Sequence, residues 1–272
     1  MKDYGIRLER TGHIAVVTFD RPSRQNSMDE HMWTCFEEVI SDLKHSLPRV
    51  VVVTGAGPKA FCAGFDINPN NPQVTELAKA METCDKAPAQ ALIKRVRTTT
   101  DSLVFLPVPI IAAIGGLAYG GGAEIASRCD LRVMDPDAVI CFSEVKLGLM
   151  PDHGGVVGLT RLVGPAKAAD LILTARKLGA AEALALGVVS RISTPGRALD
   201  EAIELAEGIA NNGPRSVRHA LKVIRKTPEL TYMDALEMES KEAVDLIVTG
   251  ECVYGIAAFL TKEKPDFPEP ED

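Results

Sequence analysis

The stretch PIIAAIGGLAYGGGAEIASR, residues 109–128, combines the features that decide how this chain folds. An apolar run of strand length is followed by three successive glycines, Gly120 to Gly122, and then by Glu124 at the start of an apolar helix. Glycines at the end of a buried strand let another molecule approach the backbone, and the first amides of a helix are unpaired and carry partial positive charge. The segment has neither the Lys-Ser/Thr pair of a P-loop nor the spacing G-x-G-x-x-G, so it indicates an oxyanion hole better than a phosphate site.

A second glycine-bearing segment, TGAGPKAFCAGFDI at residues 54–67, also follows an apolar strand. Its tight Ala-Gly turn is expected to point the N–H of Ala63 outward beside Gly121, so that two backbone donors face one point. Such a pair holds a carbonyl oxygen as it gains negative charge, and loss of one donor typically costs about 2.7–4 kcal/mol of transition-state stabilisation. Because glycine turns are common, an ordinary strand-to-helix loop is the alternative interpretation of either segment alone.

The overall composition is that of a globular protein with a large buried core. The chain has 272 residues, of which 46% are hydrophobic, and this length permits one α/β domain or one such domain with a helical appendage. The formal net charge is −7 at pH 7 and the sequence contains no long run of Lys and Arg. This charge pattern argues against a nucleic-acid partner.

Cysteine usage and the distribution of apolar residues indicate the compartment. The six cysteines lie far apart and form no C-x-x-C pair, which is typical of a reducing environment. The amino terminus lacks the apolar core of a signal peptide, and no apolar stretch reaches the roughly twenty residues that a membrane span needs. We therefore expect a soluble, cytoplasmic protein with no membrane partner.

Hydrophobic periodicity places strands and helices in the order of a largely parallel, buried sheet. Strand-length runs at 13–19 and 50–54 flank a helical pattern at 29–44, with Asp29 near its start. The same order returns with helical material at 74–106, a strand at 108–114, a helix after Gly122, and short strands at 131–134 and 139–142.

The chain changes character after residue 198. Residues 199–211, 214–226 and 232–248 each read as a helix, separated by Asn-Gly-Pro and Thr-Pro. We divide the chain into an α/β core at 1–198 and a helical region at 199–272. The apolar faces of these helices are expected to pack against another subunit or on the parent domain, and the pattern alone favours neither.

The two glycine segments together resemble the crotonase, or enoyl-CoA hydratase/isomerase, superfamily. The resemblance continues through DRPSRQNSM at 20–28, FSEVKLGLMPDHGGVVGLTRLVG at 142–164, AAEALALGVVSRI at 180–192 and GIAAFLTKEKPDF at 255–267. It implies an α/β fold built as a spiral of ββα units, with a C-terminal helical trimerisation region and trimers that often pair into hexamers. It also implies that an acyl-CoA thioester binds with its oxygen between the amides that match Ala63 and Gly121. Coenzyme A then enters as part of the substrate, with no tightly bound cofactor.

Two glutamates are the first candidates for proton transfer. Glu124 follows the glycines and Glu144 lies twenty residues later, just after a strand, so both side chains are expected in one cleft. Two carboxyls that share a pocket titrate jointly, which lets one act as an acid and the other as a base near neutral pH. The resemblance implies that Glu124 activates water and that Glu144 delivers a proton to the α-carbon, which favours an enoyl-CoA hydratase.

Asp152 departs from the simplest hydratase pattern. An aspartate here resembles the proton-shuttling acid of dienoyl-CoA isomerases and the nucleophile of related dehalogenases, but it is also suited to capping the helix that follows. Double-bond isomerisation therefore stays open as an alternative, and thioester hydrolysis does so because the same oxyanion hole and a water-activating glutamate could serve it. A non-catalytic CoA-binding protein is the least favoured hypothesis. His153, beside it, is expected at the pocket mouth or facing solvent.

The resemblance also assigns residues to the substrate and to its CoA moiety. Phe65 and Tyr119 depart from the usual pattern and either reshape the acyl pocket or only pack. Asp66 is expected chiefly as a loop anchor, and Cys62 as a buried thiol. The spacing of the five histidines predicts no metal site. The set assigned to substrate and CoA is Arg24, the backbone around Ala60, Phe61 and Cys62, and Asp66, Ile67, Gly120 and Pro151, with Phe259 and Lys262 reaching the CoA of a neighbouring subunit.

Overall fold

The main sheet of the protein has six strands and is almost entirely parallel. The computed structural model describes residues 4–270. Strand order across the sheet is β1-β2-β3-β5-β7-β10, and β1 alone runs antiparallel to its neighbour β2. The strands span β1 (Gly5–Thr11), β2 (Ile14–Asp20), β3 (Val50–Gly55), β5 (Ile110–Ile114), β7 (Leu131–Met134) and β10 (Arg191–Ile192). The parallel, buried sheet predicted from the β-branched runs is confirmed, while the N-terminal β1 was not predicted.

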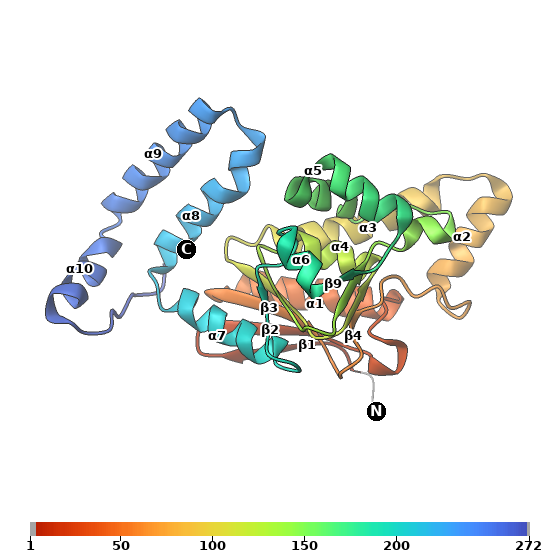
Figure 1. Ribbon diagram of the computed structural model, residues 1–272, viewed down its shortest axis with the longest axis horizontal. Helices are drawn as coiled ribbons and strands as arrows, with labels where there is room; N and C mark the ends of the chain where they lie inside the picture. Colours follow the sequence, from red (N-terminus) through yellow and green to blue (C-terminus); the bar gives the residue numbers. More distant parts are fainter. Residues whose placement is uncertain (1–3, 271–272) are drawn as a thin grey trace.

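A smaller four-stranded sheet accompanies it and turns the chain into a spiral (Figure 1). Its order is β4 (Ala60–Cys62), β6 (Leu117–Tyr119), β8 (Val139–Cys141) and β9 (Leu178–Gly179). The strands β4, β6 and β8 each follow a strand of the main sheet within a few residues. Glycine permits this passage, because a Cβ on Gly55 would lie 2.2 Å from the Phe61 carbonyl oxygen and one on Gly116 would lie 2.6 Å from that of Lys59. The repeated ββα order confirms the predicted crotonase-like spiral.

Helices cover both faces of the main sheet. The first, α1, begins where the sequence predicts, because the Asp29 carboxylate accepts a hydrogen bond of 2.9 Å from the Met32 amide. Its buried face packs Trp33 and Phe36 into the core beside Phe19 of β2. The helices are α1 (Glu30–His45), α2 (Pro72–Thr83), α3 (Ala87–Val104), α4 (Gly121–Arg128), α5 (Gly155–Thr174), α6 (Ala180–Ala185), α7 (Ala198–Ala210), α8 (Pro214–Lys226), α9 (Tyr232–Val248) and α10 (Glu251–Thr261), with short 3-10 turns η1 (Pro22–Arg24), η2 (Glu144–Leu147) and η3 (Thr227–Glu229).

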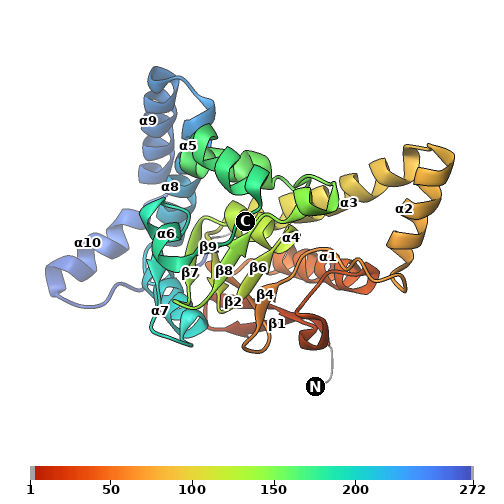
Figure 2. The same cartoon turned by 45° about the vertical axis from the view of Figure 1, so that its right-hand side comes forward.

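The C-terminal helices divide into one that packs on the sheet and three that project from it. On α7, the alanines at 202, 206 and 210 lie against Val50, Val52 and Ile111 of the main sheet. Helix α7 therefore belongs to the core layer, although the sequence division at 198/199 places it in the C-terminal region. Helices α8, α9 and α10 extend away from both sheets (Figures 1 and 2).

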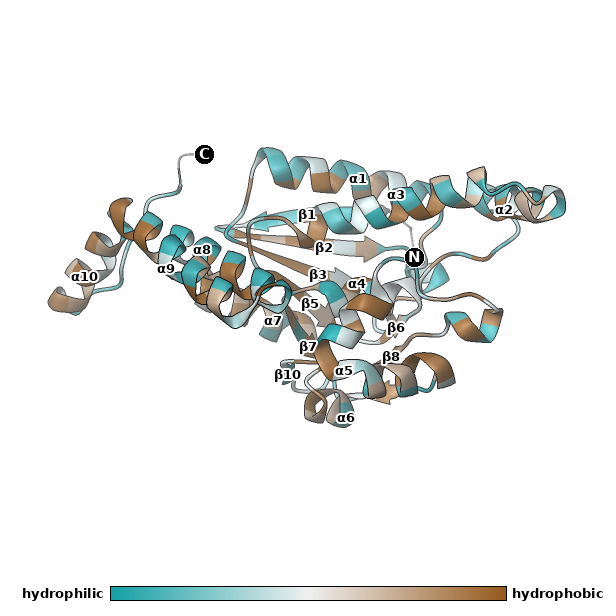
Figure 3. Ribbon diagram, turned by 90° about the horizontal axis from the view of Figure 1, so that it is seen from above, coloured by the Kyte–Doolittle hydropathy of each residue, from teal (hydrophilic) through white to brown (hydrophobic). Residues whose placement is uncertain are grey.

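The projecting helices leave hydrophobic side chains uncovered. On α10, Val253, Ile256 and Leu260 are 64%, 57% and 74% exposed, and Figure 3 shows hydrophobic residues on this helix as well as along the central strands. Such a patch is typical of a protein–protein interface. Within residues 4–270 no single helix is long and apolar enough to cross a bilayer, and α9 and α10 meet the same criteria only as a pair bent by 73°.

Candidate active site

A cavity of about 400 Å³ lies where the ends of β4, β6 and β8 meet helices α2 and α3. Its walls are mainly apolar and include Leu77 and Met81 of α2 and Leu92 of α3. Polar side chains reach it from the opposite side, where α4, η2 and the start of α5 converge. The cavity brings together seven residues that the sequence analysis assigned to the site, namely Ala63, Ile67, Gly120, Gly121, Glu124, Glu144 and Asp152.

The assignment of the Ala63 amide as an oxyanion donor is wrong. This N–H donates a hydrogen bond of 3.0 Å to the Gln25 carbonyl oxygen and is therefore used within the fold. Two residues later, Phe65 forms a parallel bridge with Met28, in which the Met28 amide donates to Gly64 and the Asp66 amide donates to Met28. In a parallel bridge, the residue between the two that bond to the partner strand points its own N–H away from that strand, and here this residue is Phe65. The Phe65 amide is thus the donor that faces outward.

The Phe65 amide lies next to the start of α4. A Cβ on Gly64 would sit 2.8 Å from the Tyr119 carbonyl oxygen and 3.0 Å from the Gly121 nitrogen, so the two backbone segments touch. Because α4 begins at Gly121, the Gly121 amide has no acceptor in its own helix. Within residues 4–270 neither the Gly121 nor the Phe65 amide has a hydrogen-bond partner. The position of Gly121 fits the prediction, and Phe65 replaces Ala63 as its neighbour.

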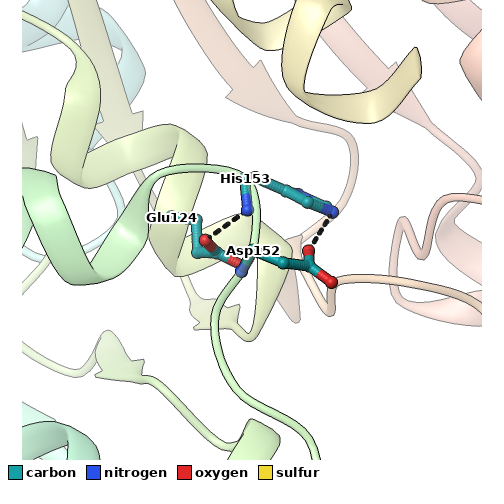
Figure 4. A group of neighbouring side chains, drawn as sticks. All are labelled: Glu124, Asp152 and His153. Atoms are coloured by element: carbon teal, nitrogen blue, oxygen red, sulfur yellow. Dashed lines mark hydrogen bonds and ion pairs between the residues drawn. The ribbon is translucent and has the colours of Figure 1, made fainter. Parts of the chain in front are cut away.

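Glu124 is a buried carboxylate held by the start of another helix. It lies in the first turn of α4 and is 1% exposed. Its Oε2 accepts a hydrogen bond of 2.8 Å from the His153 amide (Figure 4) and another of 2.7 Å from the Gly155 amide. Its Oε1 accepts a longer bond of 3.3 Å from the Asp152 amide. Burial raises the pKa of Glu124, and the charges of Glu144 and Asp152 add to this, while the backbone amides oppose it.

Glu144 has the opposite surroundings. It begins η2 directly after β8, and both carboxyl oxygens are buried with no hydrogen-bond partner among the described residues. One of them, Oε1, lies 3.4 Å from where a Cβ on Gly120 would stand. Burial raises the pKa of Glu144. The two carboxyls titrate jointly, and the backbone donors around Glu124 favour its ionised form, although burial still raises the pKa of Glu124 to about 8.

Asp152 does not cap the helix that follows it, so that alternative is wrong. The N-cap of α5 is Gly154, which has no side-chain cap, and the carboxylate of Glu124 binds the amides at this end instead. The Asp152 side chain lines the cavity, is 38% exposed, and contacts His153 Nε2 through Oδ1 at 3.1 Å (Figure 4). Burial, and then the charge of Glu144, raises the pKa of Asp152 to about 6.

His153 is not at the surface. It is 5% exposed, and burial together with the charge of Arg128 lowers the pKa of His153 to about 4. The ligand atoms of Glu124, Asp152 and His153 all lie within 4.8 Å of one another, which is close enough for a metal ion. Because Oε2 of Glu124 already accepts two backbone hydrogen bonds, the group fits an acid–base cluster better than a set of metal ligands.

The residues assigned to CoA outside the main cavity fall into three places. Arg24 and Asp66 line a separate cavity of about 340 Å³, where the Asp66 carboxylate also accepts a hydrogen bond of 2.6 Å from Arg21, as a loop anchor does. The strand residues Ala60, Phe61 and Cys62 are buried, as is Pro151, so their side chains belong to the core.

The remaining two CoA assignments lie far from the cavity. Phe259 is on α10 and 82% exposed, and Lys262 caps the same helix. Figure 2 places α10 at the end of the molecule opposite α2. A contact with the CoA of a neighbouring subunit stays a prediction.

Comparison with known proteins places these features in a family context. A family model described as enoyl-CoA hydratase/isomerase matches residues 9–270. A short-chain-enoyl-CoA hydratase from Clostridium acetobutylicum is 34% identical over 258 residues, which cover 94% of this chain and 95% of that protein. A carnitinyl-CoA dehydratase from Escherichia coli is 32% identical over 267 residues, covering 96% and 97%. The crystal structure of an enoyl-CoA hydratase from Bacillus anthracis matches with a TM-score of 0.87 at 32% identity, covering 97% of this chain and 99% of that one.

Proposed function

The chain belongs to the enoyl-CoA hydratase/isomerase family of the crotonase superfamily, and from this premise we propose that it adds water across the 2,3 double bond of an enoyl-CoA thioester. One observation carries the proposal. Two carboxyls share the cavity, and Glu124 is held by three backbone amides, whereas both oxygens of Glu144 have no hydrogen-bond partner within residues 4–270. This asymmetry supplies a base and an acid in the same pocket at the same pH.

The thioester carbonyl is polarised by backbone donors. Its oxygen binds between the amides of Phe65 and Gly121, which are free of other acceptors in residues 4–270. As the double bond is attacked, negative charge moves to this oxygen and the enolate forms. Each donor of such a pair is worth about 2.7–4 kcal/mol in the transition state.

The two glutamates move the protons. Oε1 of Glu124 accepts one long hydrogen bond of 3.3 Å and keeps lone-pair capacity for a water molecule. Glu124 takes a proton from this water as the oxygen bonds to Cβ, and Glu144 gives its proton to Cα. The product gains one hydroxyl and one hydrogen, and the proton on Glu124 returns to Glu144 before the next cycle.

The rest of the molecule suggests where the substrate and the partners lie. The apolar side chains of α2 and α3 suit an acyl chain, and the cavity beside Arg24 suits the polar CoA moiety, with no other cofactor needed. The exposed apolar faces of α9 and α10 support self-association as a trimer or a dimer of trimers.

Isomerisation is the second candidate, and the position of Asp152 favours it. Its carboxylate lines the cavity and does not cap α5, so a third carboxyl is available to move a proton along a conjugated acyl chain. Thioester hydrolysis would use the same amides and Glu124, with release of free CoA.

One experiment distinguishes these reactions. Enoyl-, dienoyl- and saturated acyl-CoA thioesters are incubated with the protein in heavy-oxygen water, and the products are resolved by mass spectrometry. Hydration adds one labelled oxygen and two hydrogens to the enoyl-CoA. A mass-neutral change of double-bond position indicates isomerisation, and a labelled free acid indicates hydrolysis.

Variants connect the reaction to the cavity. Glu124→Gln and Glu144→Gln are expected to lower the hydration rate by a factor of about 10²–10⁴ each, the usual contribution of a positioned acid or base. Glu207→Gln, on an exposed position of α7, is the matched control and should leave the rate unchanged. Parent-like hydration in both cavity variants, or no labelled product from any enoyl-CoA, would rule out the proposal.

A further inference from the structure

His153 is the residue at which three parts of the cavity meet. Its ring packs edge-on against Trp33, with centroids 5.5 Å apart and planes at 84°. On its other side it touches the start of α4, because a Cβ on Gly121 would lie 2.8 Å from Cε1 and 2.9 Å from Nδ1. Its backbone amide donates to Glu124, and its Nε2 contacts Asp152. The ring is therefore held in one orientation by contacts on several sides.

The surroundings of the two ring nitrogens decide which one carries the proton. Nδ1 is buried and has no hydrogen-bond partner among the described residues, whereas Nε2 is 3.1 Å from a carboxyl oxygen of Asp152. Nδ1 lacks a partner in either tautomer, whereas a proton on Nε2 gains the Asp152 oxygen as an acceptor, so a proton on Nδ1 is disfavoured. A proton on both nitrogens is disfavoured as well, because burial keeps the ring neutral. The remaining form has its proton on Nε2.

We propose that His153 is a positioning residue that donates its Nε2–H to Asp152 and thereby holds this carboxylate as an ionised proton acceptor in the cavity. A hydrogen bond to the charged form of an acid favours that form. Asp152 is then a second base in the pocket beside Glu124, and His153 is the residue that orients it, as catalytic bases in other enzymes are oriented by a hydrogen-bonded neighbour. The inference deepens the proposed function and rests on it for the identity of the substrate.

The other charged groups near Asp152 do not supply this donor. Glu124 of α4 and Glu144 of η2 face the same space and both raise the energy of a negative charge on Asp152. Arg128 of α4 donates one hydrogen bond of 2.7 Å to the His153 carbonyl oxygen and another to the Asp101 carboxylate, so neither of these bonds is made to Asp152. The side chains of α2 and α3 that line the cavity are apolar. Apart from the Asp152 backbone amide, His153 is therefore the group among the described residues that contacts this carboxylate and can offset its burial.

The first test measures protonation directly and needs no substrate. In protein labelled with nitrogen-15 at histidine, the ring of His153 is assigned from its loss in His153→Gln. We expect a neutral ring with the proton on Nε2 at pH 7. Carbon-13 spectra of the Asp152 carboxyl, assigned from its loss in Asp152→Asn, should show its titration moving to higher pH in His153→Ala than in the parent. A proton on Nδ1, or an unchanged Asp152 titration, overturns the proposal even if the protein turns over enoyl-CoA.

The second test uses the different reach of two amide side chains. Glutamine can place its NH₂ near the position of Nε2, whereas the shorter asparagine places it near Nδ1. On the best acyl-CoA substrate, His153→Ala should lower kcat by about tenfold or more and move the acid limb of the kcat profile to higher pH. His153→Gln should restore the parent limb and His153→Asn should not.

Each remaining outcome has a defined meaning. Equal behaviour of the Gln and Asn variants would contradict the proposed hydrogen bond, because bulk alone would then explain the loss. His45→Gln, at an exposed end of α1, is the matched control. If no acyl-CoA reacts, the proposed function fails while the spectra still decide the protonation of the pair.

Discussion

Replacing Gly121 by alanine tests the backbone donor without changing any charged group. The backbone at Gly121 is not in the left-handed region, so alanine meets no conformational strain there. The new methyl group would instead lie 2.8 Å from Cε1 and 2.9 Å from Nδ1 of His153, closer than a Cβ is normally found. The ring has little room to turn aside, because Trp33 packs against it and Nε2 lies 3.1 Å from Oδ1 of Asp152. Either the start of α4 or the ring must therefore move.

The size of the effect follows from what moves. Overpacking of a well-filled site costs about 1–3 kcal/mol of stability. If the start of α4 shifts, the Gly121 amide no longer points at the thioester carbonyl oxygen of the substrate. The expected fall in kcat is then the rate contribution of one oxyanion-hole donor, about 10²–10³-fold. Because the methyl group carries no charge, the pKa values of the cavity carboxyls change little, and the shape of the pH profile should be retained.

The assay combines kinetics with unfolding. Loss of the conjugated thioester absorbance of an enoyl-CoA gives kcat and KM, and urea unfolding gives the free energy of unfolding. Gly208→Ala is the matched control, because within residues 4–270 an added Cβ there meets no atom within 4 Å beyond the local backbone of its own helix. Alanine at this position should stabilise α7 by about 0.5–1 kcal/mol with kcat unchanged. The double variant Gly121→Ala/His153→Ala should lose less stability than the sum of the losses in the two single variants, because removing the imidazole ring relieves the clash. Parent kcat in Gly121→Ala, or strictly additive losses, would refute the reasoning.

The remaining predictions concern titration and assembly. In the parent, kcat should fall at high pH as Glu144 loses its proton, and Glu144→Gln should abolish this limb in a pH series. Burial raises the pKa of Asp152 from 3.8 to about 6, so its contribution to stability is present below pH 3.8 and lost as the pH rises to about 6; Asp152→Asn should remove that fall in urea unfolding. The pKa of His153 is lowered from 6.5 to about 4, so its contribution to stability is present above pH 6.5 and lost as the pH falls towards 4. In urea unfolding, His153→Gln should remove this loss of stability at low pH. Leu260→Glu, on the exposed face of α10, should shift the protein to monomer in analytical ultracentrifugation, and an unchanged mass would argue against this face as the interface.

Elements with a strong local pattern could be predicted from the sequence. Strand β3 is a run of valines and α1 has both an apolar face and a capping aspartate, and both appear where expected. Short strands such as β4 and β6 have only three residues, so their periodicity carries almost no signal. Their positions follow from pairing with each other across the sheet, which a local pattern does not record.

The candidate site was predictable in residue type but not in backbone direction. Glu124 and Glu144 were candidates from their positions, one after the glycines and one just after a strand, and the family resemblance decided in favour of both. The choice between Ala63 and Phe65 depends on which amide Gln25 occupies, and that contact joins residues 38 positions apart. Of the two expectations for His153, the pocket fits and solvent exposure is wrong, because the buried ring lines the cavity and fills the space that Gly121 leaves. The errors at Ala63 and His153 both concern contacts between segments that are distant in the sequence.

The position of Glu124 ties the proposed chemistry to the folding of α5. This helix has no capping side chain of its own, so its first amides depend on a carboxylate from α4. The partial positive charge at the helix start in turn favours the ionised carboxylate that a base requires, against the effect of burial. Replacing Glu124 by glutamine turns one acceptor oxygen into a donor that faces a backbone N–H, which costs about 1–3 kcal/mol of stability. A loss of 10²–10⁴ in kcat corresponds to about 3–5 kcal/mol of barrier, and it is measured on the molecules that remain folded. The two roles of this carboxylate can therefore be separated by measuring both quantities in one variant.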